Sequence, residues 1–246
     1  MLLALFLIDL AAGLYLFLPL VGRRNVGVKF YRLILIVSGA LLACAAAAHV
    51  LARARDAALA DGALLLLTAI VYFTLRFPKR LVFRVPAALL GGGYLALAVW
   101  IWQQTTNASL PWSIAGALSS IALLGSVNLA MLLGHWYLVV RGMSIDPLKR
   151  LTIATLAATI VRALVVAIAL IVPEMWYSVA IRQGIFFWMR AGWGLLGPLA
   201  LYPMIWGTVR IRSTMAATGI LYVDVVAVVI GEVLGGWLSA VAHVPV

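Results

Sequence analysis

Residues 57–75 read AALADGALLLLTAIVYFTL and are followed at once by RFPKR at residues 76–80. This run is long enough for one membrane-spanning helix, because a hydrocarbon core of about 30 Å needs roughly 20 apolar residues. It is also the weakest such run in the chain, since Asp61 interrupts it and leaves only residues 62–75 without a charge. Whether it spans decides on which side of a membrane every later connection lies.

The composition leaves little room for any other fold class. Of the 246 residues, 66% are hydrophobic and 10% are charged, whereas soluble domains have roughly 25% charged residues. Apolar segments cover residues 1–21, 33–52, 57–75, 85–102, 112–140, 151–172, 185–208 and 214–242. We therefore expect an all-α polytopic membrane bundle of eight transmembrane helices. It would form one transmembrane domain over residues 1–246, with possible four-helix halves at 1–104 and 112–246.

The basic residues test the weak third segment. If all eight segments span, the connections alternate between the two sides of the membrane. The odd-numbered connections hold Arg23, Arg24, Lys29, Arg32, Arg76, Lys79, Arg80, Arg84, Arg141, Lys149, Arg150, Arg210 and Arg212, and the even-numbered ones hold only Arg53, Arg55 and Arg182. Cytoplasmic loops carry the excess of Lys and Arg, so this distribution predicts eight helices with the N-terminus and C-terminus outside.

The same distribution explains the net charge of +11. It predicts a cytoplasmic basic rim that faces anionic lipid, not a nucleic-acid site. Cys44 is the only cysteine, which excludes an intrachain disulfide and a cysteine-based metal cluster. The first segment contains Asp9 and has no basic region before it, so we interpret it as a retained helix, not a signal peptide. The Arg-, Ala- and Leu-rich composition favours a bacterial cytoplasmic (inner) membrane.

Apart from Asp61 in the third segment, five charged residues lie inside apolar segments: Asp9, Arg162, Arg190, Asp224 and Glu232. Each costs at least about 2.5 kcal/mol at the bilayer centre unless it is paired or hydrated. Counting about 1.5 Å per residue places Arg162 level with Asp224 near the midplane, and Arg190 with Glu232 in the outer layer. One interpretation is two structural ion pairs. Because there are three carboxylates and only two arginines, one carboxylate lacks an arginine partner. Asp9 or Glu232 is the candidate for a side chain that gains and loses a proton.

Asn128 and His135 are seven residues apart on the fifth segment and therefore share nearly one helix face, which we expect to point inward. An inward histidine could bind haem, bond a quinone or relay protons, and a single hydrogen bond between helices is the alternative. His49 and His243 are expected near the outer side, whereas His135 is expected in the inner half. A bis-histidine haem needs two histidines at one depth, which excludes His135 with either of the others. His49 with His243 is the remaining pair and would be close to the surface, so we do not predict a haem.

Helix seven combines a charge with helix-breaking residues. From Arg190 onward it reads RAGWGLLGPLALYP, which predicts a kinked helix and a cavity wall beside Arg190. Glycine and proline are also common in ordinary membrane helices. Trp188 and Trp193 belong to an excess of tryptophan toward the outer side, which favours an aromatic pocket or a partner-docking surface. Gly231 and Gly235 have the G-x-x-x-G spacing that permits close helix packing.

The helix count, the orientation and the run IGEVLGG at residues 230–236 resemble the membrane-anchor subunits of polysulfide and dimethyl sulfoxide reductases. The resemblance implies a chain without its own cofactor, a quinone near the outer face, and redox partner subunits with iron–sulfur and molybdenum centres. No motif transfers a quinone-site residue. From the sequence, Arg190 is the expected hydrogen-bond donor, Glu232 or Asp9 the proton acceptor, and Trp188 and Trp193 the walls.

Two other hypotheses remain open. A proton- or ion-coupled transporter would use a midplane polar site of Arg162, Asp224, Asn128 and His135. The broken seventh helix supports it, and the lack of an inverted repeat weakens it. A purely structural or assembly subunit would use the buried charges only to hold helices together. For the electron-transfer subunit we expect redox proteins as partners, and we expect no catalytic residue or metal site in this chain.

Overall fold

A computed structural model describes residues 1–78, 80–140, 142–171 and 173–246, apart from the side chain of Arg24. All regular elements within these ranges are helical. Seven helices are long and apolar enough to cross a membrane: α1 (Leu2–Val21), α2 (Arg23–Leu51), α3 (Arg55–Thr74), α4 (Leu81–Thr106), α5 (Leu110–Val139), α6 (Asp146–Ala169) and α10 (Thr214–Ala242). The weak third segment is among them, so the helix predicted there is confirmed.

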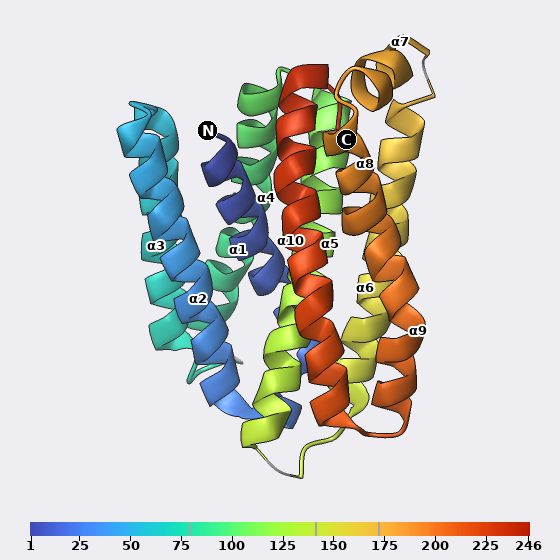
Figure 1. Cartoon of the computed structure of the whole chain (residues 1–246). Helices are drawn as coiled ribbons and strands as arrows, with labels where there is room; N and C mark the ends of the chain where they lie inside the picture. Colours follow the sequence, from blue (N-terminus) through green and yellow to red (C-terminus); the bar gives the residue numbers. More distant parts are fainter. Residues whose placement is uncertain (79, 141, 172) are drawn as a thin grey trace.

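The remaining predicted segment, residues 185–208, folds as three consecutive pieces. These are α8 (Ile185–Ala191), the π-helix η2 (Gly192–Leu196) and α9 (Gly197–Arg210). Figure 1 shows α8 and α9 as one rod beside α6 and α10. Pro198 falls in the first turn of α9, directly after the π-helix. The α-helical hydrogen-bond pattern is interrupted at η2, within the stretch where the glycines and prolines predict a kink. Two short helices, α7 (Pro173–Trp176) and η1 (Tyr177–Ile181), precede the rod.

Helices α1 and α5 lie at the centre of the bundle. On one side they contact α2 and α4, with α3 beyond, and on the other they contact α6 and α10 (Figure 1). The two central helices approach each other closely at Gly13 and Gly125, since a Cβ on Gly13 would lie 2.5 Å from the backbone oxygen of Ile121. Small residues are used in membrane bundles because they allow this backbone approach. Residues from both predicted halves therefore share one packed interior.

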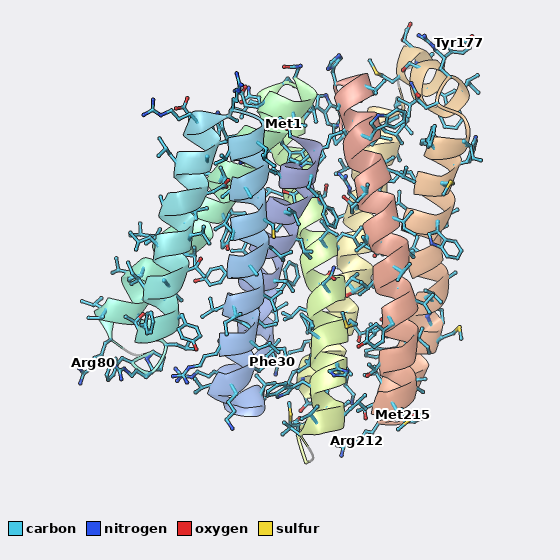
Figure 2. All side chains as sticks on the ribbon, turned by 60° about the vertical axis from the view of Figure 1, so that its left-hand side comes forward. Met1, Phe30, Arg80, Tyr177, Arg212 and Met215 are labelled. Carbon is cyan, nitrogen blue, oxygen red and sulfur yellow. The ribbon has the colours of Figure 1, made fainter. Side chains whose placement is uncertain are left out.

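The two ends of the bundle differ in charge. Both chain termini lie at one end, and we call this the terminal end (Figure 1). The α1–α2, α3–α4, α5–α6 and α9–α10 connections lie at the opposite end, which we call the basic end. Figure 2 shows Arg80 and Arg212 there and Met1 and Tyr177 at the terminal end. Among the basic residues counted from the sequence, Lys79 and Arg141 lie outside the described residues.

Candidate functional site

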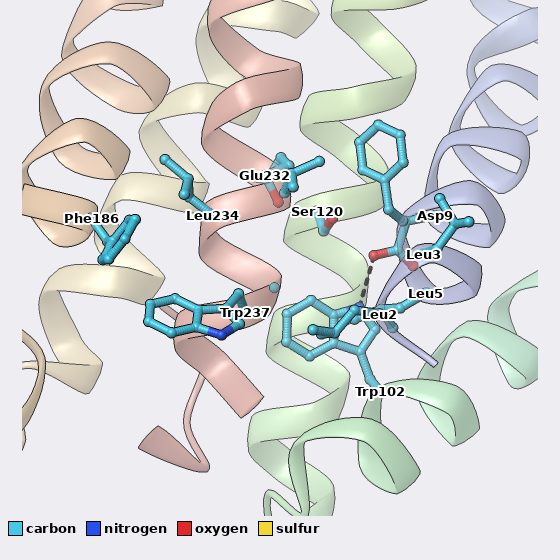
Figure 3. A pocket seen from close by; sticks show the side chains of 13 residues that line it. Leu2, Leu3, Leu5, Asp9, Trp102, Ser120, Phe186, Glu232, Leu234 and Trp237 are labelled. Carbon is cyan, nitrogen blue, oxygen red and sulfur yellow. Dashed lines mark hydrogen bonds between the residues drawn. The ribbon is translucent and has the colours of Figure 1, made fainter. Parts of the chain in front are cut away.

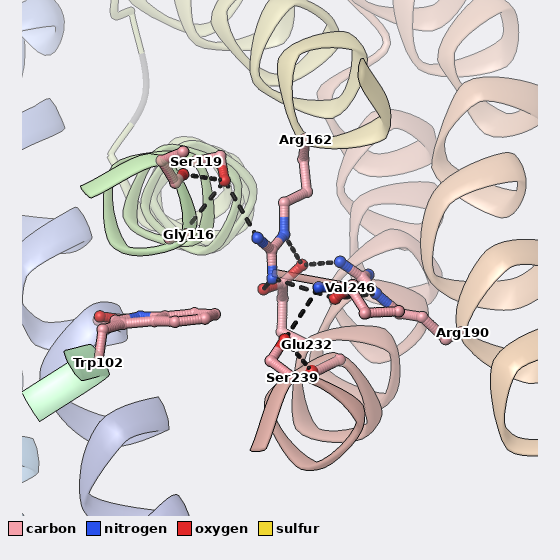
Figure 4. A network of polar contacts seen from close by, with 11 residues as sticks. Trp102, Gly116, Ser119, Arg162, Arg190, Glu232, Ser239 and Val246 are labelled. Carbon is pink, nitrogen blue, oxygen red and sulfur yellow. Dashed lines mark hydrogen bonds and ion pairs between the residues drawn. The ribbon is translucent and has the colours of Figure 1, made fainter. Parts of the chain in front are cut away.

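Glu232 on α10 holds two arginines from different helices (Figure 4). Arg162 on α6 donates from Nε to Oε1 over 3.1 Å and from Nη2 to Oε2 over 3.0 Å. Arg190 on α8 donates from Nη2 to Oε1 over 2.7 Å. All three side chains are buried. Charge-assisted hydrogen bonds of this kind are short and strong, and removing one partner from a buried set is costly. We call these three residues the charge cluster.

Neighbouring groups complete the charge cluster. Arg162 also donates from Nη1 to Ser119 Oγ on α5 over 3.1 Å. The carbonyl oxygen of Val246 accepts from Arg190 Nε at 3.4 Å and from Arg162 Nη2 at 3.5 Å. The backbone N–H of Val246 in turn donates to Ser239 Oγ over 2.9 Å. The segment after α10 therefore folds back over the cluster and supplies one of its acceptors.

Glycines make room for this arrangement. A Cβ on Gly194 in η2 would lie 2.5 Å from the Cα of Gly231 in α10, so both positions need glycine for the two helices to touch. A Cβ on Gly235 would lie 2.6 Å from the oxygen of Val246 and 2.8 Å from Arg190 Nε. The G-x-x-x-G spacing of α10 thus serves two purposes, a close helix contact and a space for a guanidinium group.

A tryptophan connects the charge cluster to a further carboxylate. Trp102 on α4 is buried, and its Nε1 donates to Asp9 Oδ2 on α1 over 2.8 Å. The Cζ atom of Arg162 lies 5.6 Å from the centroid of the same ring. An indole has a negative face and a positive N–H edge, so it suits a cation on its face and an anion at its edge. Asp9 Oδ1 has no hydrogen-bond partner within the described residues.

Asp9 and Glu232 line one cavity of about 450 Å³ near the terminal end (Figure 3). The lining comes from α1, α4, α5, α8 and α10 and is mostly apolar, with Ser120 as a further polar side chain: Leu2, Leu3, Leu5, Phe6, Asp9, Trp102, Ser120, Phe186, Glu232, Val233, Leu234, Gly236 and Trp237. Of these, Leu2, Leu3, Phe186 and Val233 are exposed. The cavity therefore opens through an apolar rim and has carboxylates inside.

The arginine pairing agrees only partly with the sequence prediction. The pair of Arg190 with Glu232 is confirmed, whereas the pair of Arg162 with Asp224 is wrong, because Arg162 binds Glu232. Helix α6 begins at Asp146, before the apolar segment that starts at residue 151. This places Arg162 about 24 Å from the start of its helix, level with Glu232 at about 27 Å and not with Asp224 at about 15 Å.

The other midplane candidates do not form a group. Asp224 is buried, and neither of its oxygens has a hydrogen-bond partner in the described part of the chain. Asn128 is buried and donates from Nδ2 to the backbone oxygen of Leu124 over 2.8 Å, within its own helix. His135 is exposed, so the prediction that it points inward is wrong. It lies close to the basic end of α5, and its Nδ1 is 3.5 Å from the hydroxyl of Tyr222.

The predicted aromatic walls are also wrong. Trp188 and Trp193 are 56% and 52% exposed and do not line the cavity. Positions two apart on a helix point to opposite sides, so burying Arg190 turns Trp188 outward. The aromatic lining comes instead from Phe6, Trp102, Phe186 and Trp237. In the sequence, Trp102 is one of several tryptophans predicted toward the outer side. Nothing in the sequence distinguishes it from the others as a buried side chain.

A second buried pair was missed. His49 Nδ1 on α2 and Asp61 Oδ2 on α3 lie 2.7 Å apart, and both side chains are fully buried. The two residues flank the short α2–α3 connection, and this spacing was the available signal. Asp61 therefore lowers the hydropathy of its segment, but its contact with His49 joins α3 to α2.

Comparison with models of protein families, with curated proteins and with solved structures found no match for this chain. Its function has to be inferred from its own geometry.

Proposed function

We propose that this chain is the quinone-binding membrane subunit of a multi-subunit respiratory electron-transfer complex. The observation that supports this proposal most directly is the position of Asp9, a buried carboxylate with one unpartnered oxygen among the described residues, in the wall of an apolar cavity. Such a group is the acceptor that a quinol hydroxyl requires. The expected anchor function, with redox partner subunits bound, agrees with this chemistry.

We further propose that the chain crosses a bacterial cytoplasmic membrane eight times, with α8, η2 and α9 together forming one crossing and both termini outside. The excess of Lys and Arg in the connections at the basic end supports this orientation. Asp9 then lies about 10 Å below the outer end of α1. The cavity would be in the outer half of the bilayer, and its exposed apolar rim would face lipid.

The cavity suits a quinone in size and polarity. Its volume of about 450 Å³ falls in the range of small-molecule sites, which are mostly apolar with a few placed polar groups. The flat ring of Trp102 and the apolar side chains would pack against the quinone head. The isoprenoid tail would leave between Leu3 and Val233, whose exposed side chains border the cavity.

The roles that we propose differ from those expected from the sequence. Quinol oxidation releases two protons and two electrons, and Asp9 Oδ1 would accept the protons one at a time, releasing the first to the outer side before it takes the second. Glu232 is committed to two arginines, so it would hold the cluster in place and not act as the acceptor. Arg190 does not line the cavity, and Ser120 would instead donate a hydrogen bond to the quinone oxygen. The electrons would pass to a redox centre in a partner subunit.

The test is the isosteric change Asp9→Asn in the complex purified gently from native membranes. We expect quinol turnover to fall by about 10²-fold or more, because a proton acceptor is lost, while the subunit composition stays the same. Quenching of tryptophan fluorescence by a short-chain ubiquinone or menaquinone would report binding. Asp56→Asn makes the same change at an exposed position of α3 and serves as the control. Unchanged turnover in an assembled Asp9→Asn complex would remove Asp9 from the mechanism.

A structural or assembly subunit is the second candidate. It is favoured by the charge cluster, in which one carboxylate joins α6, α8 and α10. Under this hypothesis Arg190→Gln would lower the yield of complex without changing the specific activity of the complex that remains. A parallel fall in quinone binding per complex would favour the first proposal.

A further inference from the structure

A second, much smaller cavity lies between α6, α9 and α10, away from the charge cluster. Its volume is about 10 Å³, enough for one particle of the size of a water molecule. Asp224 of α10, three threonines of α6, and Pro198 and Tyr202 of α9 are among the residues that line it. It shares no lining residue with the cavity that contains Asp9.

Asp224 brings a carboxyl group to this cavity, with no hydrogen-bond or charge partner among the described residues. Its side chain is fully buried, and neither carboxylate oxygen has a hydrogen-bond partner there. Both buried arginines are bound to Glu232, which lies about 12 Å further along α10. A buried carboxyl group without a partner either keeps its proton or is accompanied by a counter-charge. The cavity beside Asp224 is the place where a counter-charge would fit.

The α6 wall of the cavity offers oxygen lone pairs. Thr152, Thr155 and Thr159 are spaced three and four residues apart and therefore lie on one face of the helix. The hydroxyl of Thr152 donates to Leu148 O and that of Thr159 to Thr155 O, each over 2.8 Å. Their protons are thus used within the helix, and their lone pairs stay free. Thr155 Oγ1 has no hydrogen-bond partner in the described ranges.

The α9 wall of the cavity lies at a turn that contains proline. Pro203 lies inside α9 and has no N–H to donate to the backbone oxygen of Leu199, one turn earlier. Pro198 and Tyr202, on either side of this turn, line the cavity.

We propose that Asp224 and the Thr152, Thr155 and Thr159 face of α6 bind one Na⁺ ion. A hard cation is the partner that carboxylate, hydroxyl and backbone oxygens prefer. A single carboxylate neutralises one positive charge, so a divalent ion would leave an uncompensated charge in the bundle. K⁺ is larger than a space of this size favours. The site is separate from the outer cavity and stands whether or not that cavity binds quinone.

The experiment measures the melting temperature of the purified chain in detergent as Na⁺ replaces choline at constant ionic strength. We expect a saturable rise with Na⁺ that K⁺ does not reproduce, because a ligand that binds only the folded state stabilises it. Asp224→Asn should abolish the rise. Thr155→Val keeps the side-chain shape but removes one ligand, and should weaken Na⁺ affinity about 10-fold or more. Thr208→Val, at a threonine of α9 that does not line the cavity, is the control.

Direct ²²Na⁺ binding to the wild-type chain gives a second readout that does not depend on how the variants fold. One ion bound per chain, displaced by unlabelled Na⁺ but not by K⁺, would support the site. Two results would overturn it. One is a melting temperature that responds equally to Na⁺, K⁺ and choline, as expected for a cavity filled by water beside a protonated carboxyl group. The other is an Na⁺ response that survives Asp224→Asn.

Discussion

Replacing Glu232 with glutamine should destabilise the bundle more than any other single change of one charge. The amide keeps the shape of the side chain but removes the charge shared by hydrogen bonds of 3.1, 3.0 and 2.7 Å. Arg162 and Arg190 would then face each other, both fully buried, without a counter-charge. Breaking a buried pair by removing one partner costs about 3–5 kcal/mol. Since two cations lose their partner, we expect a loss near 5 kcal/mol in the free energy of unfolding.

The assay is reversible unfolding of the purified chain in mixed micelles, followed by tryptophan fluorescence. Glu174→Gln makes the same chemical change at an exposed residue of α7 and should alter stability by less than about 0.5 kcal/mol. A double-mutant cycle with Arg162→Gln should give a coupling energy of about 2 kcal/mol or more, because the two side chains are in direct contact. A loss from Glu232→Gln as small as that of the control, or strictly additive single losses, would refute the buried cluster.

Two further changes test the packing around this cluster and the α2–α3 pair. Gly235→Ala should cost about 1–3 kcal/mol of stability, because its Cβ would clash with atoms 2.6 and 2.8 Å away. Gly219→Ala, in open space on the same helix, should be neutral or stabilising. Asp61→Ala should cost about 1–3 kcal/mol because it leaves His49 buried without its partner. Asp56→Ala, exposed in the first turn of α3, should cost less than about 1 kcal/mol. Thermal unfolding of each variant with its control measures both effects, and equal losses within a pair would contradict the assignment.

Much of the fold could be predicted because hydropathy and charge act over whole segments. The segment at residues 57–75 was predicted as a helix in spite of Asp61, on the evidence of the basic residues that follow it. Its helix, α3, spans Arg55–Thr74. The glycines and prolines after Arg190 predicted a broken helix, and η2 occurs there. These features depend on local composition, so no knowledge of the neighbouring helices was needed.

The candidate site could be predicted only in part. The sequence identified Asp9, Arg190 and Glu232 as buried charges, because a charge within an apolar run has to be compensated. It did not identify Trp102, which joins Asp9 to the charge cluster through its N–H and its ring face. Tryptophan is common near membrane interfaces, so its type and position alone do not separate an interfacial ring from a buried one.

The sequence by itself determined that this chain forms a bundle of apolar helices, which ends carry the basic residues, and which charges are buried. Only the tertiary structure decided the partners. Arg162 binds Glu232, and Asp224 is left beside a small cavity. The reason is that α6 begins at Asp146, before its apolar segment, which places Arg162 level with Glu232 and not with Asp224. Hydropathy fixes roughly where a helix lies in the membrane. The level and rotation of its side chains depend on where the helix begins and on the neighbours against which it packs.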